Sequence, residues 1–152
     1  MKYEDRQTVL AILQACGVFT AEEVCVAMEV VDCGLTGGID GDYPLFTIEC
    51  DKSVRGYACV GKTPLTQSTW HLYWICVHPE CQGIGAGRAL QSFIEGFVRD
   101  KGGKRLVLET SSQPMYEQAR RFYRQSKYEE VGLIRDFYKP GDDCMIFCKT
   151  FE

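Results

Sequence analysis

The sequence predicts a mixed α/β fold, in which a mostly antiparallel central sheet with one parallel strand pair carries helices on both faces. The unbroken apolar run His71–Val77 is typical of a central strand that is covered on both sides. A glycine-rich turn and an amphipathic helix of about 84–100 follow it, and a second apolar strand comes next over 104–110. Because strand–helix–strand units of this kind form right-handed crossovers, we expect these two strands to be parallel neighbours.

Two amphipathic helices are predicted before the sheet. The first covers 5–16 and ends at Gly17. The second begins at the capping box formed by Thr20 and Glu23 and ends near Gly34. Their apolar residues recur at helical spacing and give each helix one face to bury: Val9, Ile12, Leu13 and Cys16, then Val24, Ala27, Met28 and Val31.

The other elements form hairpins on either side of the parallel pair. After a turn-like segment over 36–43, Leu45–Cys50 and Val54–Gly61 are joined by a short polar turn, which indicates a β-hairpin. A polar loop over 62–69 leads to the central strand. The chain then continues beyond the parallel pair with a helix of about 115–126 and with strands near 129–137 and 144–151.

Composition narrows the classes of function. The 152 residues suit one domain, 1–152, with 45% hydrophobic and 25% charged residues. A net charge of −4 without a basic run argues against nucleic acid as a partner. The apolar stretches are too short to span a membrane. The N-terminus is too charged for a signal peptide, so we expect a cytoplasmic protein.

The cysteine pattern argues against a metal site. The chain has nine cysteines but no CxxC motif, and it has only two histidines. Four cysteines lie on apolar faces or in apolar strands and are predicted to be small, buried and reduced: Cys16, Cys25, Cys76 and Cys148. Cys76 and Cys81 flank the glycine-rich turn, so thiol modification there is expected to inhibit activity.

The glycine-rich turn is predicted to hold a phosphate-type anion, because the first N–H groups of a helix lack partners and the dipole there is positive. A P-loop would need GxxxxGK[ST], and the turn has no lysine followed by Ser or Thr. A dinucleotide fingerprint would need a third glycine where Arg88 stands, although Glu109 is close to the expected acidic position. The pattern Gln/Arg-x-x-Gly-x-Gly/Ala is met by Gln82, Gly85 and Gly87.

This pattern, between a strand and a helix, resembles the pyrophosphate loop of the GCN5-related N-acetyltransferase (GNAT) superfamily, which binds acetyl-coenzyme A. Downstream, Ala119 and Tyr123 match the segment Asn-x-x-Ala-x-x-x-Tyr-x-x-x-Gly-Phe of that family. Tyr116 replaces its asparagine, which in the family helps to hold the pantetheine arm. Lys127 replaces its glycine, so the helix is expected to end differently here. The resemblance covers about 45–151, and the ending 135–143 looks like an uncharacterised bacterial branch.

The resemblance implies the acyl-CoA N-acyltransferase fold, whose parallel strand pair splays apart to admit the pantetheine arm. It also implies a set of cofactor-binding residues, in part through the main chain: Ile75, Cys76 and Val77 on the central strand, then Gln82, Gly83, Ile84, Gly85, Ala86, Gly87 and Arg88, and Tyr116. Arg88 could equally be a solvated arginine at a helix start. No metal is implied.

Tyr123 and Glu109 are the predicted catalytic residues. Tyr123 matches the family tyrosine near the coenzyme sulfur and would be the general acid; the alternative is an aromatic residue of the core. Glu109 closes a strand where ligands gather and would be the base, directly or through water; the alternative is an exposed carboxylate. His71 and Tyr73 are lesser candidates for substrate contact, and strand alternation predicts that they share a face with Ile75.

The ending of the chain contributes a predicted acidic rim at the acceptor mouth, which would favour a cationic amine: Asp136, Tyr138, Asp142 and Asp143. Pro140-Gly141-Asp142 also suits a plain turn. The expected function is acetyl transfer from acetyl-CoA to an amine of an unidentified small molecule or protein. The alternatives are a non-catalytic coenzyme A-binding or sensor module and a nucleotide- or dinucleotide-binding protein. An exposed strand edge would allow a homodimer.

Overall fold

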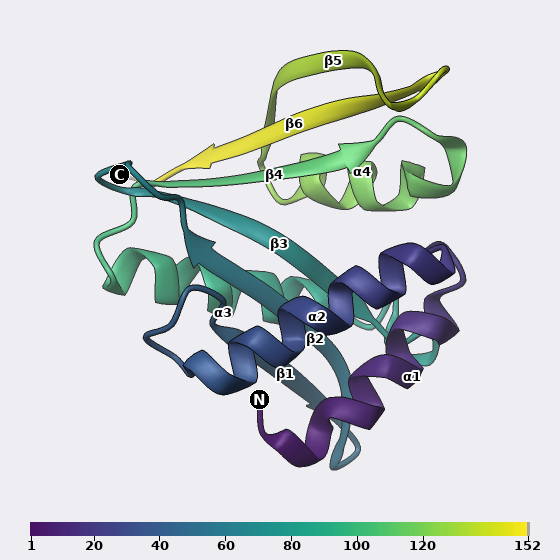
Figure 1. The fold of residues 1–152 in the computed structure, drawn as a ribbon, viewed down its shortest axis with the longest axis vertical. Coiled ribbons are helices and arrows are strands. Elements are labelled where there is room, and N and C mark those ends of the chain that lie inside the picture. Colours follow the sequence, from purple (N-terminus) through teal and green to yellow (C-terminus); the bar gives the residue numbers. More distant parts are fainter. Residues whose placement is uncertain (152) are drawn as a thin grey trace.

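The computed structural model describes residues 1–151, in which six strands form one sheet with the order β1-β2-β3-β4-β6-β5 (Figure 1). β3 and β4 are parallel, and the other neighbouring pairs are antiparallel. The predicted mixed sheet with one parallel pair is therefore confirmed. The strands are β1 (Leu45–Cys50), β2 (Ser53–Lys62), β3 (Thr69–Val77), β4 (Arg105–Ser111), β5 (Glu129–Lys139) and β6 (Asp142–Thr150).

Helices cover both faces of this sheet, as predicted. α1 (Arg6–Cys16) and α2 (Ala21–Gly37) lie over β1, β2 and β3 on one face (Figure 1). α3 (Ala86–Asp100) and α4 (Glu117–Gln125) pack on the other. The short 3-10 turns Pro79–Cys81 and Pro114–Tyr116 precede α3 and α4.

The two sides of the sheet bury separate apolar clusters. The larger cluster lies between the sheet and α3 and α4, and its fully buried members include Ile94, Leu106 and Phe147. The second lies under α1 and α2 and includes Val9, Val31 and Tyr57. Burying these side chains is the main favourable contribution to folding, and it holds the helices against the strands that carry the site.

The ends of the first two helices follow local signals. α1 ends at Gly17, which adopts a φ of 68°. Thr20 and Glu23 form the predicted capping box at the start of α2, with the Glu23 N–H donating to Thr20 Oγ1 at 3.2 Å. α2 continues to Gly37, past the predicted end near Gly34. Gly34 serves close packing instead, since a Cβ there would lie 2.3 Å from the Tyr43 carbonyl oxygen.

The end of α4 corrects one expectation. Lys127 has a φ of 64°, and the N–H groups of Lys127 and Tyr128 donate to the carbonyls of Arg124 and Tyr123, both at 3.0 Å. This is the Schellman arrangement that a glycine usually completes. The expectation that the helix would end differently because of Lys127 is therefore wrong. The lysine adopts the left-handed conformation itself, at a steric cost.

The cysteines are all free thiols, but only one of the four predicted to be buried is fully buried. Cys76 is buried, Cys16 and Cys148 are half-buried, and Cys25 is exposed. α2 directs Ala27, Met28 and Val31 toward the sheet, and this orientation leaves Cys25 on the solvent side. Its apolar neighbours in sequence were misleading because they lie on a different face of the helix.

Replacing Lys127 with glycine should stabilise the protein. Glycine adopts a φ of 64° without a Cβ clash, and this gain exceeds the cost of the greater entropy of the unfolded chain. We therefore expect the free energy of unfolding, measured in urea, to rise by about 0.5 to 1 kcal/mol. Ser126→Gly is the matched control, because Ser126 has a φ of −84° and should gain nothing. A Lys127→Gly protein less stable than the parent would contradict this account of the helix end.

Candidate active site

β3 and β4 pair over only three residues and then separate. The paired residues are Thr69–Arg105, Trp70–Leu106 and His71–Val107, and within residues 1–151 the pairing of the two strands ends there. β3 nevertheless continues to Val77, and β4 stays paired with β6 from Arg105 to Ser111. The facing edges of β3 and β4 therefore carry main-chain groups that the sheet does not use beyond His71.

The turn after β3 presents unpaired N–H groups at the start of α3. Gly85 is the N-cap of α3 with a φ of 94°, and it makes no side-chain cap hydrogen bond. Gly83 also has a positive φ, of 76°. Gly83, Ile84, Gly85 and Arg88 are exposed, whereas Ala86 is buried against Val77. The geometry fits a phosphate-type anion, because backbone donors and the positive end of the helix dipole face solvent together.

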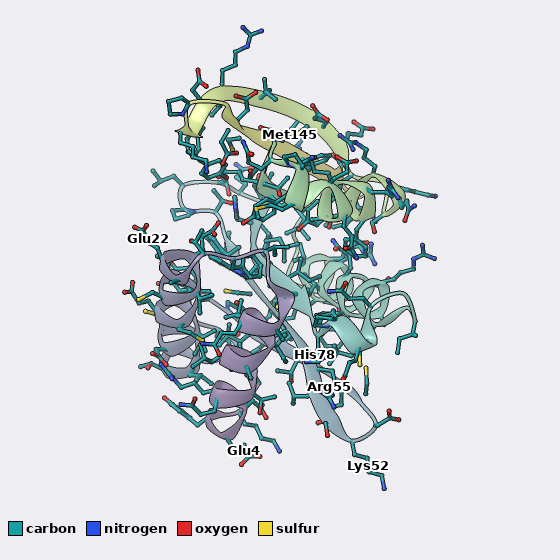
Figure 2. All side chains as sticks on the ribbon, turned by 90° about the vertical axis from the view of Figure 1, so that its right-hand side faces the viewer. Glu4, Glu22, Lys52, Arg55, His78 and Met145 are labelled. Carbon is teal, nitrogen blue, oxygen red and sulfur yellow. The ribbon has the colours of Figure 1, made fainter. Side chains whose placement is uncertain are left out.

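The Gln82 side chain is engaged within the protein. Its Nε2 donates to the Val77 carbonyl at 2.9 Å, and its Oε1 accepts from Gln118 Nε2 at 3.1 Å. Just before it, His78 N–H donates to the Arg55 carbonyl at 2.6 Å, and the two residues lie near each other in Figure 2. These contacts hold the turn against β2, β3 and α4.

A β-bulge in β3 corrects the predicted facing of its side chains. Cys59 opposes Trp74 and Val60 opposes Leu72, so Tyr73 has no counterpart on β2. Tyr73 consequently packs with the cluster under α1 and α2, and Ile75 with the cluster under α3 and α4. The expectation that Tyr73 and Ile75 share a face is wrong, because simple alternation fails across the extra residue.

Glu109 lies close to two other predicted residues on the face of the sheet that α1 and α2 occupy. It is exposed on β4, and its charge acts on both His71 and Tyr138. Burial lowers the pKa of His71 and the Glu109 carboxylate opposes that shift. Burial also raises the pKa of Tyr138, whose hydroxyl contacts Cys144 Sγ at 3.8 Å. The His71 and Tyr73 rings lie 4.7 Å apart.

Asp136 is engaged in the β5–β6 hairpin. Its carboxylate accepts the Gly141 N–H at 2.7 Å, and its own N–H donates to Asp143 Oδ1 at 2.8 Å. Asp142 is buried and accepts a hydrogen bond from the Ser111 hydroxyl. These three carboxylates therefore organise the turn and its junction with β4, which matches the plain-turn alternative.

Tyr123 approaches from the opposite face. It is buried on α4 among the larger cluster, with its ring 6.1 Å from Tyr128 and 5.9 Å from Phe147. Burial raises the pKa of Tyr123, and the nearby Cys76 adds to the effect, so its hydroxyl keeps its proton at physiological pH. Leu108 belongs to the same cluster, and Glu109, the next residue on β4, points the other way.

Tyr116 makes a contact that the sequence did not predict. Its hydroxyl donates to Glu23 Oε1 at 2.9 Å and lies 3.4 Å from the Val18 carbonyl oxygen. Burial raises the pKa of Tyr116, and the Glu23 carboxylate raises it further. The side chain predicted to hold the pantetheine arm is thus bonded to the start of α2.

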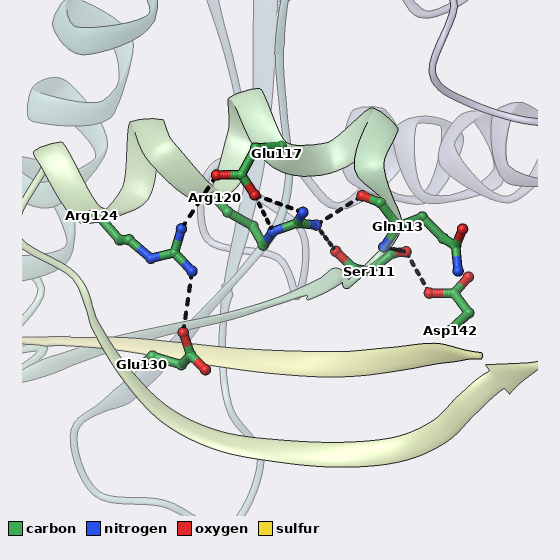
Figure 3. A network of polar contacts seen from close by, with 7 residues as sticks. All are labelled: Ser111, Gln113, Glu117, Arg120, Arg124, Glu130 and Asp142. Carbon is green, nitrogen blue, oxygen red and sulfur yellow. Dashed lines mark hydrogen bonds and ion pairs between the residues drawn. The ribbon is translucent and has the colours of Figure 1, made fainter.

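A buried arginine fixes the segment between β4 and α4 (Figure 3). Arg120 Nη1 donates to the carbonyls of Ser111 at 2.5 Å and Gln113 at 2.9 Å, and Nη2 pairs with Glu117 at 2.7 Å. Arg120 was not among the predicted site residues. The only available signal was the three-residue spacing of Glu117 and Arg120 on one helix face.

Among residues 1–151, histidine, cysteine and carboxylate side chains do not gather in groups of three or more that could hold a metal ion. In the same part, the helices lack the length and apolar character that crossing a bilayer requires.

Comparison with known proteins defines the class to which this fold and loop belong. The model of a family described as the acetyltransferase (GNAT) family matches residues 12–128, which is most of the chain. The chain therefore belongs to the GNAT family of acetyltransferases.

Individual relatives agree with this assignment. An uncharacterised N-acetyltransferase of Methanocaldococcus jannaschii is 29% identical over 113 residues, which cover 70% of this chain and 67% of that protein. A crystal structure from Desulfovibrio desulfuricans, assigned as a GNAT-family acetyltransferase, is 38% identical with a TM-score of 0.92 and covers 97% and 93% of the two chains. An acetyltransferase structure from Salmonella typhimurium with acetyl-CoA shares the fold at 19% identity, with a TM-score of 0.76 and coverage of 100% and 91%.

Replacing Glu109 with glutamine should lower the pKa of His71 further below its ordinary value of about 6.5, because the carboxylate that favours the imidazolium is lost. An NMR titration of the His71 ring measures this. Because the folded state already disfavours the charged ring, stability falls as the pH drops below about 6.5 toward the folded pKa, and Glu109→Gln should deepen that loss.

Glu49→Gln is the control, since Glu49 is an exposed carboxylate on β1. It should leave the His71 titration as it is in the parent protein. An unchanged His71 pKa in Glu109→Gln would mean that the two side chains are not in electrostatic contact.

Proposed function

We propose that this chain transfers the acetyl group of acetyl-CoA directly to a primary amine of a small molecule or protein. The observation that carries the proposal is the separation of β3 from β4 at the end of the sheet where α3 begins. An anion-binding helix start and two strand edges with unused main-chain groups lie there together. Acetyl-CoA has a diphosphate that suits the helix start and an amide-bearing pantetheine arm that suits the strand edges.

The turn from Gln82 to Arg88 would bind the diphosphate. Gly85 supplies the positive φ that opens the start of α3, and the exposed N–H groups of that start can donate to phosphate oxygens. The main chain of Ile75, Cys76 and Val77 would bind the pantetheine arm and the carbonyl oxygen. Donors fixed in this way stabilise the negative charge that develops on that oxygen.

Tyr123 and Glu109 would move the protons. The cosubstrate supplies a thioester whose acyl carbon is open to attack by a neutral amine. Glu109, directly or through water, would take the proton of the amine, and His71 beside it is a second group that could do so. Tyr123, whose raised pKa keeps its hydroxyl protonated, would donate that proton to the departing sulfur. The two residues would act from opposite faces of β4.

The acceptor would bind over the face of β4 that carries Glu109. Tyr73 and Tyr138 flank this region, and the carboxylate would favour a cationic amine. A non-catalytic coenzyme A-binding module would bind the same ligand there but would release no thiol with any amine.

Substituting Gly85 tests the diphosphate site. Alanine at a φ of 94° is strained and should distort the start of α3, so we expect Gly85→Ala to weaken coenzyme A binding about tenfold or more in calorimetry. Gly96→Ala is the matched control on the same helix, because a Cβ there meets open space. Equal affinities in the two variants, or displacement of coenzyme A by NAD or ATP, would refute the assignment.

Tyr123→Phe tests the acid. Removing the hydroxyl while keeping the ring should lower kcat by about 10²- to 10⁴-fold and leave acetyl-CoA affinity nearly unchanged. The assay is free-thiol release across a panel of amines. Tyr57→Phe is the control, because its buried hydroxyl has no hydrogen-bond partner within residues 1–151. Full turnover by Tyr123→Phe at every pH would remove Tyr123 from the role.

A further inference from the structure

Side-chain contacts close a ring around the end of the sheet where β3 and β4 separate. The ring starts at Val77, the last residue of β3. Its carbonyl accepts hydrogen bonds from Cys16 Sγ at 3.5 Å and from Gln82 Nε2 at 2.9 Å. One arm runs from each of these two donors to the start of α4. We call the ring the clasp; its members are Cys16, Glu23, Val77, Gln82, Tyr116 and Gln118.

The first arm is the connection between α1 and α2. Cys16 anchors it to β3, and Phe19 packs on Trp74 of β3 with ring centroids 6.0 Å apart. At its other end, Glu23 accepts the Tyr116 hydroxyl at 2.9 Å. Tyr116 follows β4, so this arm crosses from the far end of β3 to the segment after β4.

The second arm runs through the glycine-rich turn. The Gln82 side chain donates to the Val77 carbonyl, and its Oε1 accepts from Gln118 Nε2 at 3.1 Å. Gln118 lies on the first turn of α4, two residues after Tyr116. Both arms therefore meet on one short segment. Arg120 holds that segment to β4 through the carbonyls of Ser111 and Gln113 (Figure 3).

The two arms differ in strength. Tyr116 donates to a carboxylate and is half-buried, and its raised pKa keeps the donor protonated. The Gln82–Gln118 bond joins two neutral, exposed amides. Hydrogen bonds to charged groups are roughly twice as strong as neutral ones, so the Tyr116–Glu23 bond is the firmer closure.

We propose that the clasp gates coenzyme A exchange, and that Tyr116 and Glu23 are positioning residues that hold the α1–α2 connection across the gap. This rests on the proposed function, in which coenzyme A lies between β3 and β4. A ligand lying there would pass inside the ring, and opening one arm would widen its path in and out. Tyr116 thus acts by closing the gap on the α1–α2 side and not by contacting the pantetheine arm.

The test is stopped-flow binding of coenzyme A to the parent protein and to Tyr116→Phe. Breaking the stronger arm should raise the association and dissociation rate constants together, each by about tenfold. This corresponds to lowering each activation free energy by about 1.4 kcal/mol. The dissociation constant should change little. A direct contact between Tyr116 and the ligand would instead raise the dissociation rate constant alone, and a purely structural role would change neither.

Glu23→Ala should reproduce Tyr116→Phe, and the double variant should go no further, because both break the same Tyr116–Glu23 bond. Glu23→Ala also removes the carboxylate that accepts the Thr20 N–H, so a second variant of the capping box is needed as a control. Thr20→Ala is the matched control: it removes the hydroxyl of the α2 capping box but leaves the Glu23 carboxylate in place. Gln118→Ala should raise both rate constants by no more than about threefold, since it opens the weaker arm.

The outcomes separate the two proposals. Rate constants that are unchanged in Tyr116→Phe, or a rise in dissociation alone, would overturn the clasp while leaving coenzyme A binding intact. Effects of Thr20→Ala equal to those of Glu23→Ala would also overturn it. A parent protein that does not bind coenzyme A would overturn the proposed function and the clasp with it.

Discussion

The site depends on how β4 divides its pairing between two neighbours. β4 stays paired with β6 over its whole length but pairs with β3 only as far as Val107, so the two parallel strands diverge after His71. α3 begins just beyond β3, at the same end of the sheet. Unused strand edges and an uncapped helix start are therefore brought together by one feature of the topology. Any ligand that fills this region must satisfy main-chain donors and acceptors more than particular side chains.

Strand alternation then distributes the chemical groups. Leu108 belongs to the larger cluster and Glu109 faces the other way, so β4 separates the buried Tyr123 from the exposed carboxylate. The bulge at Tyr73 breaks this alternation on β3, so Ile75 faces the opposite side from His71 and Tyr73. As a result, one face of the gap is apolar with a protonated tyrosine, and the other carries groups able to accept a proton.

The segment after β4 is held more firmly than a surface connection requires. Arg120 is buried and binds two carbonyls of that segment and the Glu117 carboxylate. A buried guanidinium is stable only when such partners satisfy it. From this segment the Tyr116 hydroxyl reaches α2 and donates to the capping carboxylate of Glu23, so the position joins two parts of the molecule.

Local patterns were enough to predict the elements, the mixed sheet and the glycine-rich turn. Periodicity, the Thr20–Glu23 capping box and the glycine at 85 all act between residues that are close in the chain. Lys127 shows the limit of such signals, since the Schellman end forms without its usual glycine. Three features came from packing between distant segments: Asp136 binds within the hairpin, Tyr73 lies in a bulge, and Tyr116 bonds to Glu23. Tyr116 and Glu23 are 93 positions apart, and a contact between them depends on how the helices pack on the sheet, which no local pattern encodes.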